Sequence, residues 1–214
     1  MSSKMMRNNT EDKLLIKKAE FIKSAILPEN YPEKIGLEFA FVGKSNVGKS
    51  SLINSLTTRR KLAKTSKTPG RTQLVNFFLI NNETQFVDLP GYGFAKVPVA
   101  VKDKWGKIIE DYLQSDREKI VLVLLDIRRI PSKDDLNLIE WLEHYEIEYK
   151  IVFTKVDKLS NNKRVNQMKV IKNKLHIDNW ETFFYSALSK EGKNELSEYI
   201  LDQAKRSEED GRIE

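Results

Sequence analysis

A short run of glycine, serine and lysine early in the chain has the spacing of a phosphate-binding loop. The run matches the pattern G-x-x-x-x-G-K-[ST] with Gly43, Lys44, Ser45, Asn46, Val47, Gly48, Lys49 and Ser50. An apolar stretch enters it and a helical pattern leaves it, so backbone N–H groups and the positive end of a helix would face a phosphate chain. Lys49 can then reach the β- and γ-phosphates, and the Ser50 hydroxyl can ligate Mg²⁺. The motif predicts a nucleoside triphosphate site and leaves the base undecided.

Two polar runs further along the chain follow apolar stretches and indicate which base is bound. The first is Thr154, Lys155, Val156 and Asp157, and the second is Tyr185, Ser186 and Ala187. The carboxyl ends of strands are where open α/β sheets bind ligands. There the Asp157 carboxylate can accept from N1–H and the exocyclic amine of guanine, whereas adenine would leave it unpaired. Lys155 can cover the purine face and the Ala187 N–H can donate to O6, so the pattern predicts guanine.

Two other segments are typical of loops that respond to the γ-phosphate. One is Asp88, Leu89, Pro90 and Gly91, which ends a predicted strand. Asp88 can hold Mg²⁺, mostly through a water, and the Gly91 N–H can touch the γ-phosphate. The other is the basic, turn-rich stretch 59–71 followed by Thr72, which is the candidate second hydroxyl on Mg²⁺ unless it is an ordinary loop threonine. Loss of the γ-phosphate would release both segments, as in the order–disorder switch of GTPases.

Strands that alternate with helices along the chain would bring these runs close together in space. Apolar runs predict strands at 37–42, 74–80, 85–87, 120–126, 151–153 and 182–185, and helical periodicity predicts helices at 49–56, 102–113, 136–145, 165–175 and 195–204. Residues 11–27 fit either a helix or an edge strand. We therefore expect an α/β chain with the P-loop GTPase fold, in which helices cover both faces of a mostly parallel sheet and one hairpin adds an antiparallel edge strand. The predicted organisation is a flexible extension at 1–17, a single GTP-binding domain at 18–204 and a flexible tail at 205–214.

The composition suits one domain with a substantial core. The chain has 214 residues, of which 40% are hydrophobic and 32% charged, and no apolar run approaches the roughly 20 residues that a membrane span needs. It has no cysteine, and its first residues lack the apolar core of a signal peptide, which favours the cytoplasm. The two isolated histidines do not make a metal site. The net charge of +6 permits a polyanionic partner without demanding one.

In this order the motifs resemble the EngB/YsxC (YihA) group of bacterial ribosome-assembly GTPases, within the TrmE-Era-EngA-EngB-Septin-like superfamily. The most specific matches are the run 64–72, the run 88–93, and Asn76, Phe77 and Phe78. The resemblance covers residues 18–204 and leaves the extension 1–17 without a role. It implies a GTPase that binds the large ribosomal subunit, both rRNA and ribosomal proteins, during its maturation, and that supports normal cell division and septation. We expect a cytoplasmic monomer with Mg²⁺ as cofactor.

The resemblance also adds GTP contacts and bears on how hydrolysis is completed. The added contacts are Gly70, Arg71, Thr72, Gln73 and Leu74. Ras-type switches place a water-orienting glutamine directly after the Asp-x-x-Gly motif, but Tyr92 stands there, so intrinsic hydrolysis should be slow. Asn46 resembles the asparagine that ligates K⁺ in some related GTPases, and Arg71 is the other catalytic candidate, with plain loop structure as the alternative for both. A partner or K⁺ would then complete the chemistry.

Two stretches of the chain are rich in basic residues. The first stretch is Arg59, Arg60, Lys61, Lys64, Lys67 and Arg71, and the second is Lys155, Lys158, Lys163, Arg164, Lys169, Lys172 and Lys174. Both stretches could contact rRNA phosphates or could be ordinary solvated faces.

There are two alternatives to a ribosome-assembly switch. One is a metabolic P-loop enzyme such as a nucleotide kinase, against which the predicted guanine recognition argues. The other is a division-site scaffold that uses GTP only to fold or assemble.

The two candidate Mg²⁺ ligands predict different nucleotide dependence. Ser50→Ala should weaken GDP and GTP binding alike, because Ser50 would hold the ion in both states. Thr72→Ala should weaken GTP binding more than GDP binding, because only the γ-phosphate would order its loop. Affinities for both nucleotides in each variant, with and without Mg²⁺, test this. Equal loss of GDP and GTP in the Thr72 variant would remove that residue from the switch.

Overall fold

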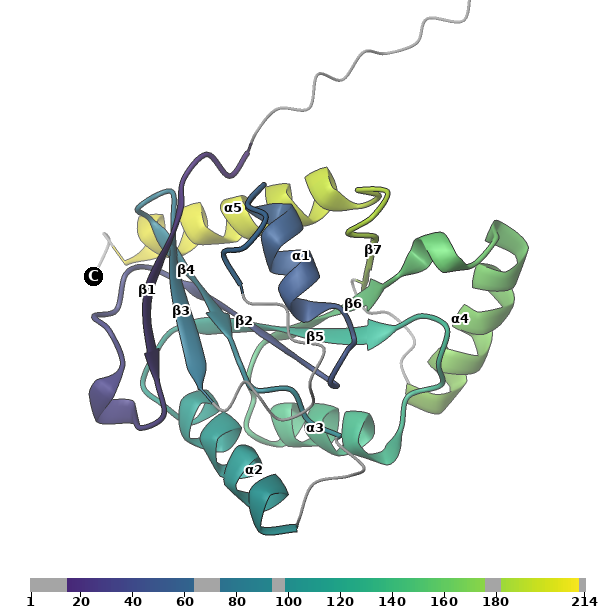
Figure 1. Ribbon diagram of the computed structural model, residues 1–214, viewed down its shortest axis with the longest axis horizontal. Helices are drawn as coiled ribbons and strands as arrows, with labels where there is room; N and C mark the ends of the chain where they lie inside the picture. The colour runs from purple at the N-terminus through teal and green to yellow at the C-terminus, as the bar shows by residue number, and fades with distance from the viewer. Residues whose placement is uncertain (1–14, 64–73, 94–98, 176–181, 212–214) are drawn as a thin grey trace, which may run out of the picture.

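One mixed sheet forms the centre of the protein (Figure 1). The computed structural model describes residues 15–63, 74–93, 99–175 and 182–211, apart from the side chains of 99–105. In this part of the chain seven strands pair in the order β1-β3-β4-β2-β5-β6-β7. The strands are β1 (Ala19–Ala25), β2 (Glu38–Gly43), β3 (Val75–Ile80), β4 (Thr84–Asp88), β5 (Lys119–Asp126), β6 (Tyr149–Thr154) and β7 (Thr182–Tyr185). The helices are α1 (Lys49–Leu56), α2 (Val99–Leu113), α3 (Lys133–His144), α4 (Asn161–Leu175) and α5 (Lys193–Asp210), with short 3₁₀ turns η1 (Pro28–Asn30) and η2 (Val156–Lys158).

The sheet is mostly parallel, as the alternation of strands and helices predicts. β2 pairs in parallel with β4 and β5, and β6 pairs in parallel with β5 and β7. β3 lies antiparallel between β4 and β1. The antiparallel strand of the hairpin is therefore present, although it is not the edge of the sheet. The edge strands are β1 and β7. For residues 11–27 the strand alternative is therefore the correct one over Ala19–Ala25.

The C-terminal helix is longer than its apolar pattern predicts. α5 continues to Asp210, whereas the pattern ends at 204 and predicts a flexible tail from 205. The last turns carry few apolar residues, but Ser207 Oγ donates to Glu118 Oε2 at 2.7 Å and ties them to the residue before β5. The expected tail is thereby corrected for residues 205–210, which are helical.

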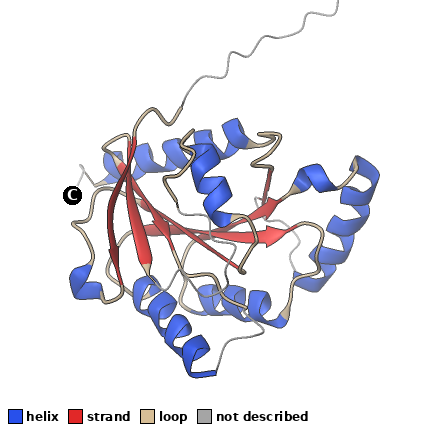
Figure 2. Ribbon diagram, in the orientation of Figure 1, coloured by secondary structure: helices blue, strands red, loops and turns tan. Residues whose placement is uncertain are grey.

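Helices cover both faces of the sheet (Figure 2). α1 and α5 pack on one face, and α2, α3 and α4 pack on the other. Side chains alternate along β2: Phe39 and Phe41 join the core under α1 and α5, while Ala40 and Val42 join the opposite core. Because both faces are covered, the middle residues of β2 and β5 are apolar on both sides of the sheet. Within the described residues no helix is long and apolar enough to cross a membrane.

A buried carboxylate stands at the amino end of β2. Glu38 is 1% exposed and accepts from Arg117 Nε at 2.8 Å and from Tyr112 Oη at 2.7 Å. Arg117 also donates to Pro32 O at 3.0 Å and to Gln85 Oε1 at 3.1 Å. Burial and the neighbouring Glu38 raise the pKa of Tyr112 well above its ordinary value, so the phenol remains a donor. The network joins α2, β2 and β4 at the end of the sheet away from the predicted nucleotide site.

Glu38→Gln should destabilise the protein without affecting nucleotide binding. The change leaves the Arg117 guanidinium buried without its counter-charge, and breaking a buried ion pair from one side costs about 3–5 kcal/mol. Tyr112→Phe should cost less, about 2 kcal/mol, because a single donor to the carboxylate is lost. Urea unfolding of both variants measures the two costs. A Glu38→Gln variant as stable as the parent would show that the pair does not constrain the sheet.

Candidate nucleotide-binding site

Five parallel strands have their carboxyl ends on the same side of the sheet (Figure 1). The pairing there is in register: Asp126 of β5 is opposite Thr154 of β6, and Thr154 is opposite Tyr185 of β7. Phe41 of β2 is likewise opposite Asp88, the last residue of β4. Since parallel strands end on the same side, the loops that follow these residues lie next to one another. The fold therefore brings together the predicted phosphate loop, the two base-recognition runs and the run that begins at Asp88.

The phosphate loop leads into α1 through an uncapped helix end. Gly48 has a φ of +115°, which other residues rarely adopt, and it gives α1 no side-chain cap. Asn46 is left-handed too, with a φ of 62°. The first helical bond runs from Leu52 N to Gly48 O at 2.8 Å, and the N–H groups of Lys49 and Ser50 have no backbone acceptor in the described chain. Free N–H groups at the start of a helix bind anions, so the loop has the local structure of a phosphate site.

The lysine of this loop contacts the aspartate that ends β4. Lys49 Nζ donates to Asp88 Oδ1, and the two side chains are 9% and 4% exposed. Burying either charge alone would be costly, so each serves as the counter-charge of the other. Leu89 and Pro90 are buried after Asp88, and Leu89 N donates to Phe41 O at 3.1 Å. The groups expected at the phosphates and at Mg²⁺ therefore lie side by side.

The first base-recognition run is fastened to the phosphate loop. Thr154 Oγ1 donates to Val47 O at 2.7 Å, and Lys155 Nζ donates to Asn46 O at 2.7 Å. Lys155 has a φ of 59°, a conformation that costs energy outside glycine and that the surrounding contacts must offset. Two consecutive carbonyls of the phosphate loop are thus held by the run that is predicted to read the base.

Asp126 is a site residue that the motifs do not predict. Its Oδ2 accepts from Lys155 Nζ at 3.0 Å and from Arg128 Nη2 at 2.7 Å, and its Oδ1 accepts from Arg128 Nε at 2.9 Å. Burial would raise the pKa of Asp126, but the hydrogen bonds from Arg128 and Lys155 outweigh it and lower the pKa to about 2. The signal that could have revealed Asp126 is its position, because it ends β5 at the edge where the predicted site lies.

The predicted guanine reader and the loop after β7 are joined through a hydroxyl. Ser186 Oγ donates to Asp157 Oδ1 at 2.7 Å and accepts from Leu188 N at 3.2 Å and Ser189 N at 3.0 Å. The hydrogen bond from Ser186 is the main cause that lowers the pKa of Asp157, which stays an acceptor at neutral pH. Ala187 is exposed, and its N–H makes no backbone hydrogen bond to any described residue. The loops offer a carboxylate and a free N–H, the pair expected for N1–H and O6 of guanine.

Tyr92 makes a long-range contact that no local pattern predicts. Its hydroxyl donates to Asp135 Oδ1 at 2.8 Å, although Asp135 lies 43 residues away. Asp135 Oδ2 accepts from Ser132 N at 2.8 Å within the capping box that starts α3. Burial and then Asp135 raise the pKa of Tyr92 well above its usual range. Since Ser45 N also donates to Tyr92 O at 3.0 Å, this tyrosine connects the phosphate loop with α3.

The other predicted contacts lie around this centre or outside the described residues. Lys44 is half-buried and pairs with Asp134 at 3.6 Å. Ser50 and Gly91 are half-buried, whereas Val156 and Tyr185 are buried. Leu74 is half-buried directly before β3. The predicted contacts Gly70, Arg71, Thr72 and Gln73 lie outside the described residues, so the second Mg²⁺ ligand and one catalytic candidate stay predictions.

Known proteins match the chain over most of its length. Residues 38–155 match the family model described as 50S ribosome-binding GTPase. The chain is 60% identical over 186 residues to the probable GTP-binding protein EngB of Fusobacterium nucleatum subsp. nucleatum, which covers 86% of this chain and 96% of that protein. It is 53% identical over 183 residues to the protein of the same name from Clostridium kluyveri, which covers 85% of this chain and 93% of that protein.

Solved structures share the fold. A crystal structure of a probable GTP-binding protein EngB matches with a TM-score of 0.65 at 22% identity, over 79% of this chain and 99% of that chain. A crystal structure of an Era variant from Aquifex aeolicus bound to GDP and AlF4⁻ matches with a TM-score of 0.63 at 28% identity, over 79% of this chain and 57% of that chain. The first likeness, at its low identity, concerns the fold alone.

Guanine selectivity should depend on Asp157. Asp157→Asn replaces one acceptor oxygen of the carboxylate by an NH₂ donor. The variant should therefore lose affinity for GTP and gain affinity for xanthosine triphosphate, whose base carries an oxygen in place of the exocyclic amine. GTP affinity should fall about 10- to 100-fold, since an unpaired polar group in a binding site costs about 1–3 kcal/mol. Competition binding with GTP, ATP and xanthosine triphosphate measures both changes. Full GTP affinity in this variant would show that the base-site assignment is wrong.

Proposed function

The chain belongs to the EngB family of GTP-binding proteins, and from this membership we propose that it is a switch in the assembly of the large ribosomal subunit. Like other members of this P-loop family, it is a GTPase. The match to a family described as 50S ribosome-binding GTPase supports this proposal. The matched segment contains the phosphate loop, Asp88 and Lys155, so it includes most of the predicted nucleotide site. The proposal includes a role in normal cell division and septation, as a monomer in the cytoplasm.

The residues at the phosphate loop fit a Mg²⁺ ion bound with the nucleotide. Mg²⁺ takes oxygen ligands and is usually held by one or two protein groups together with phosphates and waters. Ser50 offers a hydroxyl in the first turn of α1, and Asp88 offers a carboxylate beside Lys49. We assign Ser50 and Thr72 as its ligands, with Asp88 as the supporting carboxylate. The ion would neutralise charge at the β- and γ-phosphates, which Lys49 and the free N–H groups of α1 orient.

Intrinsic hydrolysis should be slow because Tyr92 stands where a water-orienting glutamine is needed. Its hydroxyl is already engaged as a donor to Asp135. Completion of the reaction is therefore assigned to a partner or to K⁺, with Asn46 and Arg71 as the catalytic candidates. Asn46 is exposed, and it is the carbonyl of this residue that accepts from Lys155. Its side chain thus has access to solvent beside the phosphate loop, as a K⁺ ligand would require.

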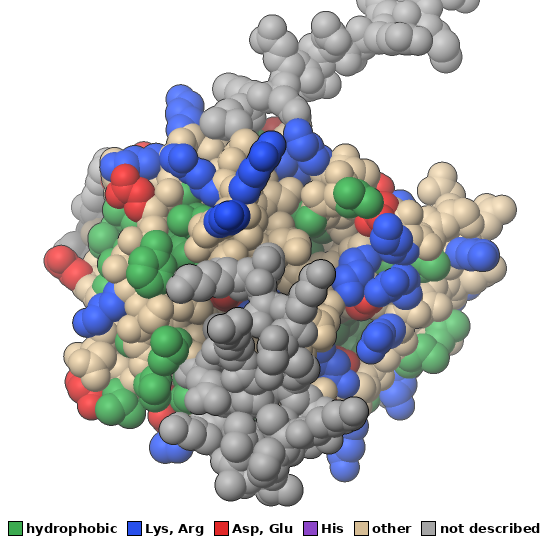
Figure 3. Space-filling view, viewed as in Figure 1, with side chains coloured by type: hydrophobic (Ala, Val, Ile, Leu, Met, Phe, Trp, Pro, Cys, Tyr) green, Lys and Arg blue, Asp and Glu red, His purple; other side chains and the backbone are tan. Residues whose placement is uncertain are grey.

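Basic side chains gather at the top and at the right of the view in Figure 3. Arg59, Arg60 and Lys61 follow α1 and are exposed. α4 contains no acidic residue. The exposed lysines of α4 are Lys163, Lys169, Lys172 and Lys174. Such clusters of positive charge suit rRNA phosphates, and they are the contact surface that the proposal assigns to the ribosomal subunit.

Binding to the large ribosomal subunit should require GTP and should weaken as the salt concentration rises. The combined changes Arg59→Ala, Arg60→Ala and Lys61→Ala should weaken binding while nucleotide affinity survives. Each phosphate contact that is lost should reduce the salt slope by roughly one counterion, so the slope should flatten by up to about 3. Subunit pelleting across a salt series, with GDP and with a non-hydrolysable GTP analogue, measures this.

A control that removes two positive charges elsewhere is Lys205→Ala with Arg206→Ala, on the exposed surface of α5, which should leave the salt slope unchanged. Equal pelleting with GDP and with the GTP analogue would contradict the switch. An unchanged slope in the triple variant would move the contact to α4. Pelleting with membranes or filaments in place of ribosomal subunits would favour a division-site scaffold instead.

A further inference from the structure

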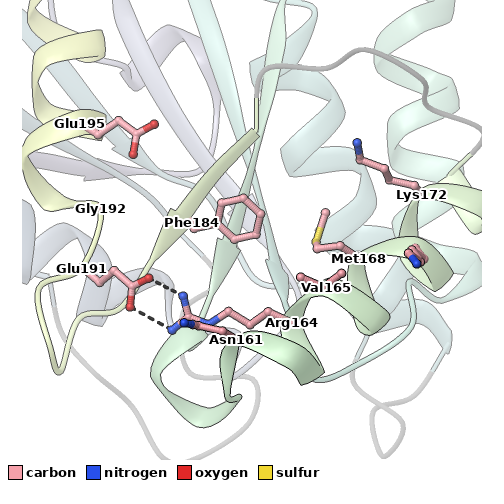
Figure 4. Close-up of a pocket in the computed structure, with 10 residues that line it drawn as sticks. Asn161, Arg164, Val165, Met168, Lys172, Phe184, Glu191, Gly192 and Glu195 are labelled. Carbon is pink, nitrogen blue, oxygen red and sulfur yellow. Dashed lines mark hydrogen bonds and ion pairs between the residues drawn. The ribbon is translucent and has the colours of Figure 1, made fainter.

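The Arg164 guanidinium makes four hydrogen bonds, to the two base-recognition loops. Figure 4 shows the two that reach Glu191. Arg164 Nε donates to Val156 O at 3.0 Å and to Leu159 O at 3.3 Å. Its Nη1 and Nη2 donate to the two carboxylate oxygens of Glu191, the second at 3.0 Å. The acceptors belong to separate segments, the turn after β6 and the loop after β7. Arg164 is therefore not the free cation that the second basic stretch suggests.

Each of these segments carries one half of the predicted guanine reader. Val156 directly precedes Asp157, so the contacts from Arg164 Nε hold the turn that carries the carboxylate. Glu191 closes the other loop, where its own carbonyl accepts from Ser186 N at 3.0 Å. Ser186 Oγ in turn donates to Asp157. One arginine thus fastens both halves of the reader without standing in the base site itself.

The pairing of Arg164 with Glu191 has the geometry of a fixed contact. Two parallel N–H···O bonds between a guanidinium and a carboxylate fix orientation as well as distance. The hydrogen bond from Arg164 is the largest effect on the pKa of Glu191 and lowers it. Next to this pair, Gly192 has a φ of +74°, and a Cβ there would lie 1.8 Å from Phe184 O. That close approach places the backbone of the loop against β7 directly after Glu191.

A pocket borders this pair. A cavity of about 600 Å³ opens there, and Met168 and Phe184 line it together with Arg164 and Glu191 (Figure 4). The hydrogen bonds of Arg164 add a second link between the turn after β6 and the loop after β7, beside the hydrogen bond from Ser186 Oγ to Asp157 Oδ1.

We propose that Arg164 and Glu191 are positioning residues for guanine selectivity, which act by fixing Asp157 relative to the Ala187 N–H. The proposal rests on the proposed function, because it takes Asp157 and Ala187 as the groups that read the base. Guanine would be read at N1–H and the exocyclic amine by one loop and at O6 by the other. Both sets of hydrogen bonds form together only if the two loops keep their separation, and small displacements of positioned groups are costly.

The test compares GDP with inosine diphosphate, whose base lacks the exocyclic amine that Asp157 would bind. Arg164→Met keeps the aliphatic stem and removes every donor. Its GDP affinity should fall about tenfold and its inosine diphosphate affinity only about twofold, because loss of alignment is felt most where more hydrogen bonds are made. Glu191→Gln should change selectivity in the same direction by less. The double variant should add little to Arg164→Met, since both changes remove one contact.

Arg206→Met is the matched control, because Arg206 is an exposed arginine of α5 and its loss should change neither affinity. Thermal unfolding of every variant separates positioning from folding. A lower unfolding midpoint in Arg164→Met with an unchanged ratio of the two affinities would make Arg164 a structural residue only and overturn the proposal. If Arg164→Met does not fold, Glu191→Gln decides the ratio, since that side chain is 43% exposed and the change keeps its size.

Asp157→Asn, measured in the same assay, separates this proposal from the function on which it rests. Full GDP affinity in that variant would remove the base-site assignment itself. Loss of GDP affinity in Asp157→Asn, with an unchanged affinity ratio in both Arg164→Met and Glu191→Gln, would leave the base site standing and reject only the role of the pair.

Discussion

Parallel pairing of the central strands is the constraint on which the rest of the site depends. β2, β4, β5, β6 and β7 end at the same edge, so each delivers the next polar residue of the chain to one place. The register is specific, because Asp126, Thr154 and Tyr185 stand opposite one another across three strands. A slip of β6 by one residue would turn Thr154 to the other face of the sheet and remove its hydrogen bond to Val47 O. The apolar cores on both faces oppose such a slip, so packing far from the nucleotide site sets the geometry within it.

At the carboxyl ends of these strands, hydrogen bonds link the phosphate loop to the base-recognition run. Lys155 holds a carbonyl of the phosphate loop and is itself held by Asp126, which Arg128 orients. A displacement of the phosphate loop would therefore displace the base-recognition run, and a displacement of that run would displace the phosphate loop. The segment after Asp88 is joined to both the phosphate loop and α3, because Tyr92 O accepts from Ser45 N and the Tyr92 hydroxyl donates to Asp135 near the start of α3. A shift of that segment would therefore displace groups of the phosphate loop and of α3.

The sequence predicts those parts of the site whose signal is local. A run with the spacing G-x-x-x-x-G-K-[ST] between an apolar stretch and a helix indicates a phosphate-binding loop, and polar runs after apolar stretches indicate the carboxyl ends of strands. Partners far away in the chain leave no such signal, which is why the contact of Tyr92 with Asp135 and that of Arg164 with Glu191 escape it. Arg164 shows the difficulty well, since a basic helix without acidic residues looks like a solvated or RNA-binding face until Glu191 is placed beside it. The end of α5 escapes for a similar reason, because Ser207 finds its partner 89 residues away.

Two buried ion pairs lie at the two ends of the sheet, and their chemistry differs in a way that matters for function. At the amino end of β2, both oxygens of Glu38 are taken by Arg117 and Tyr112, and Arg117 has further acceptors in Pro32 and Gln85. That network is closed, so it can contribute only to stability. At the other end, Lys49 is bonded to Asp88 among the described side chains, and an ammonium group has three donors. This pair is open, because the lysine can add phosphate acceptors while the aspartate remains next to it. The two pairs thus divide the roles: the closed network fixes the sheet, and the open pair keeps hydrogen-bonding capacity at the edge where a nucleotide would bind.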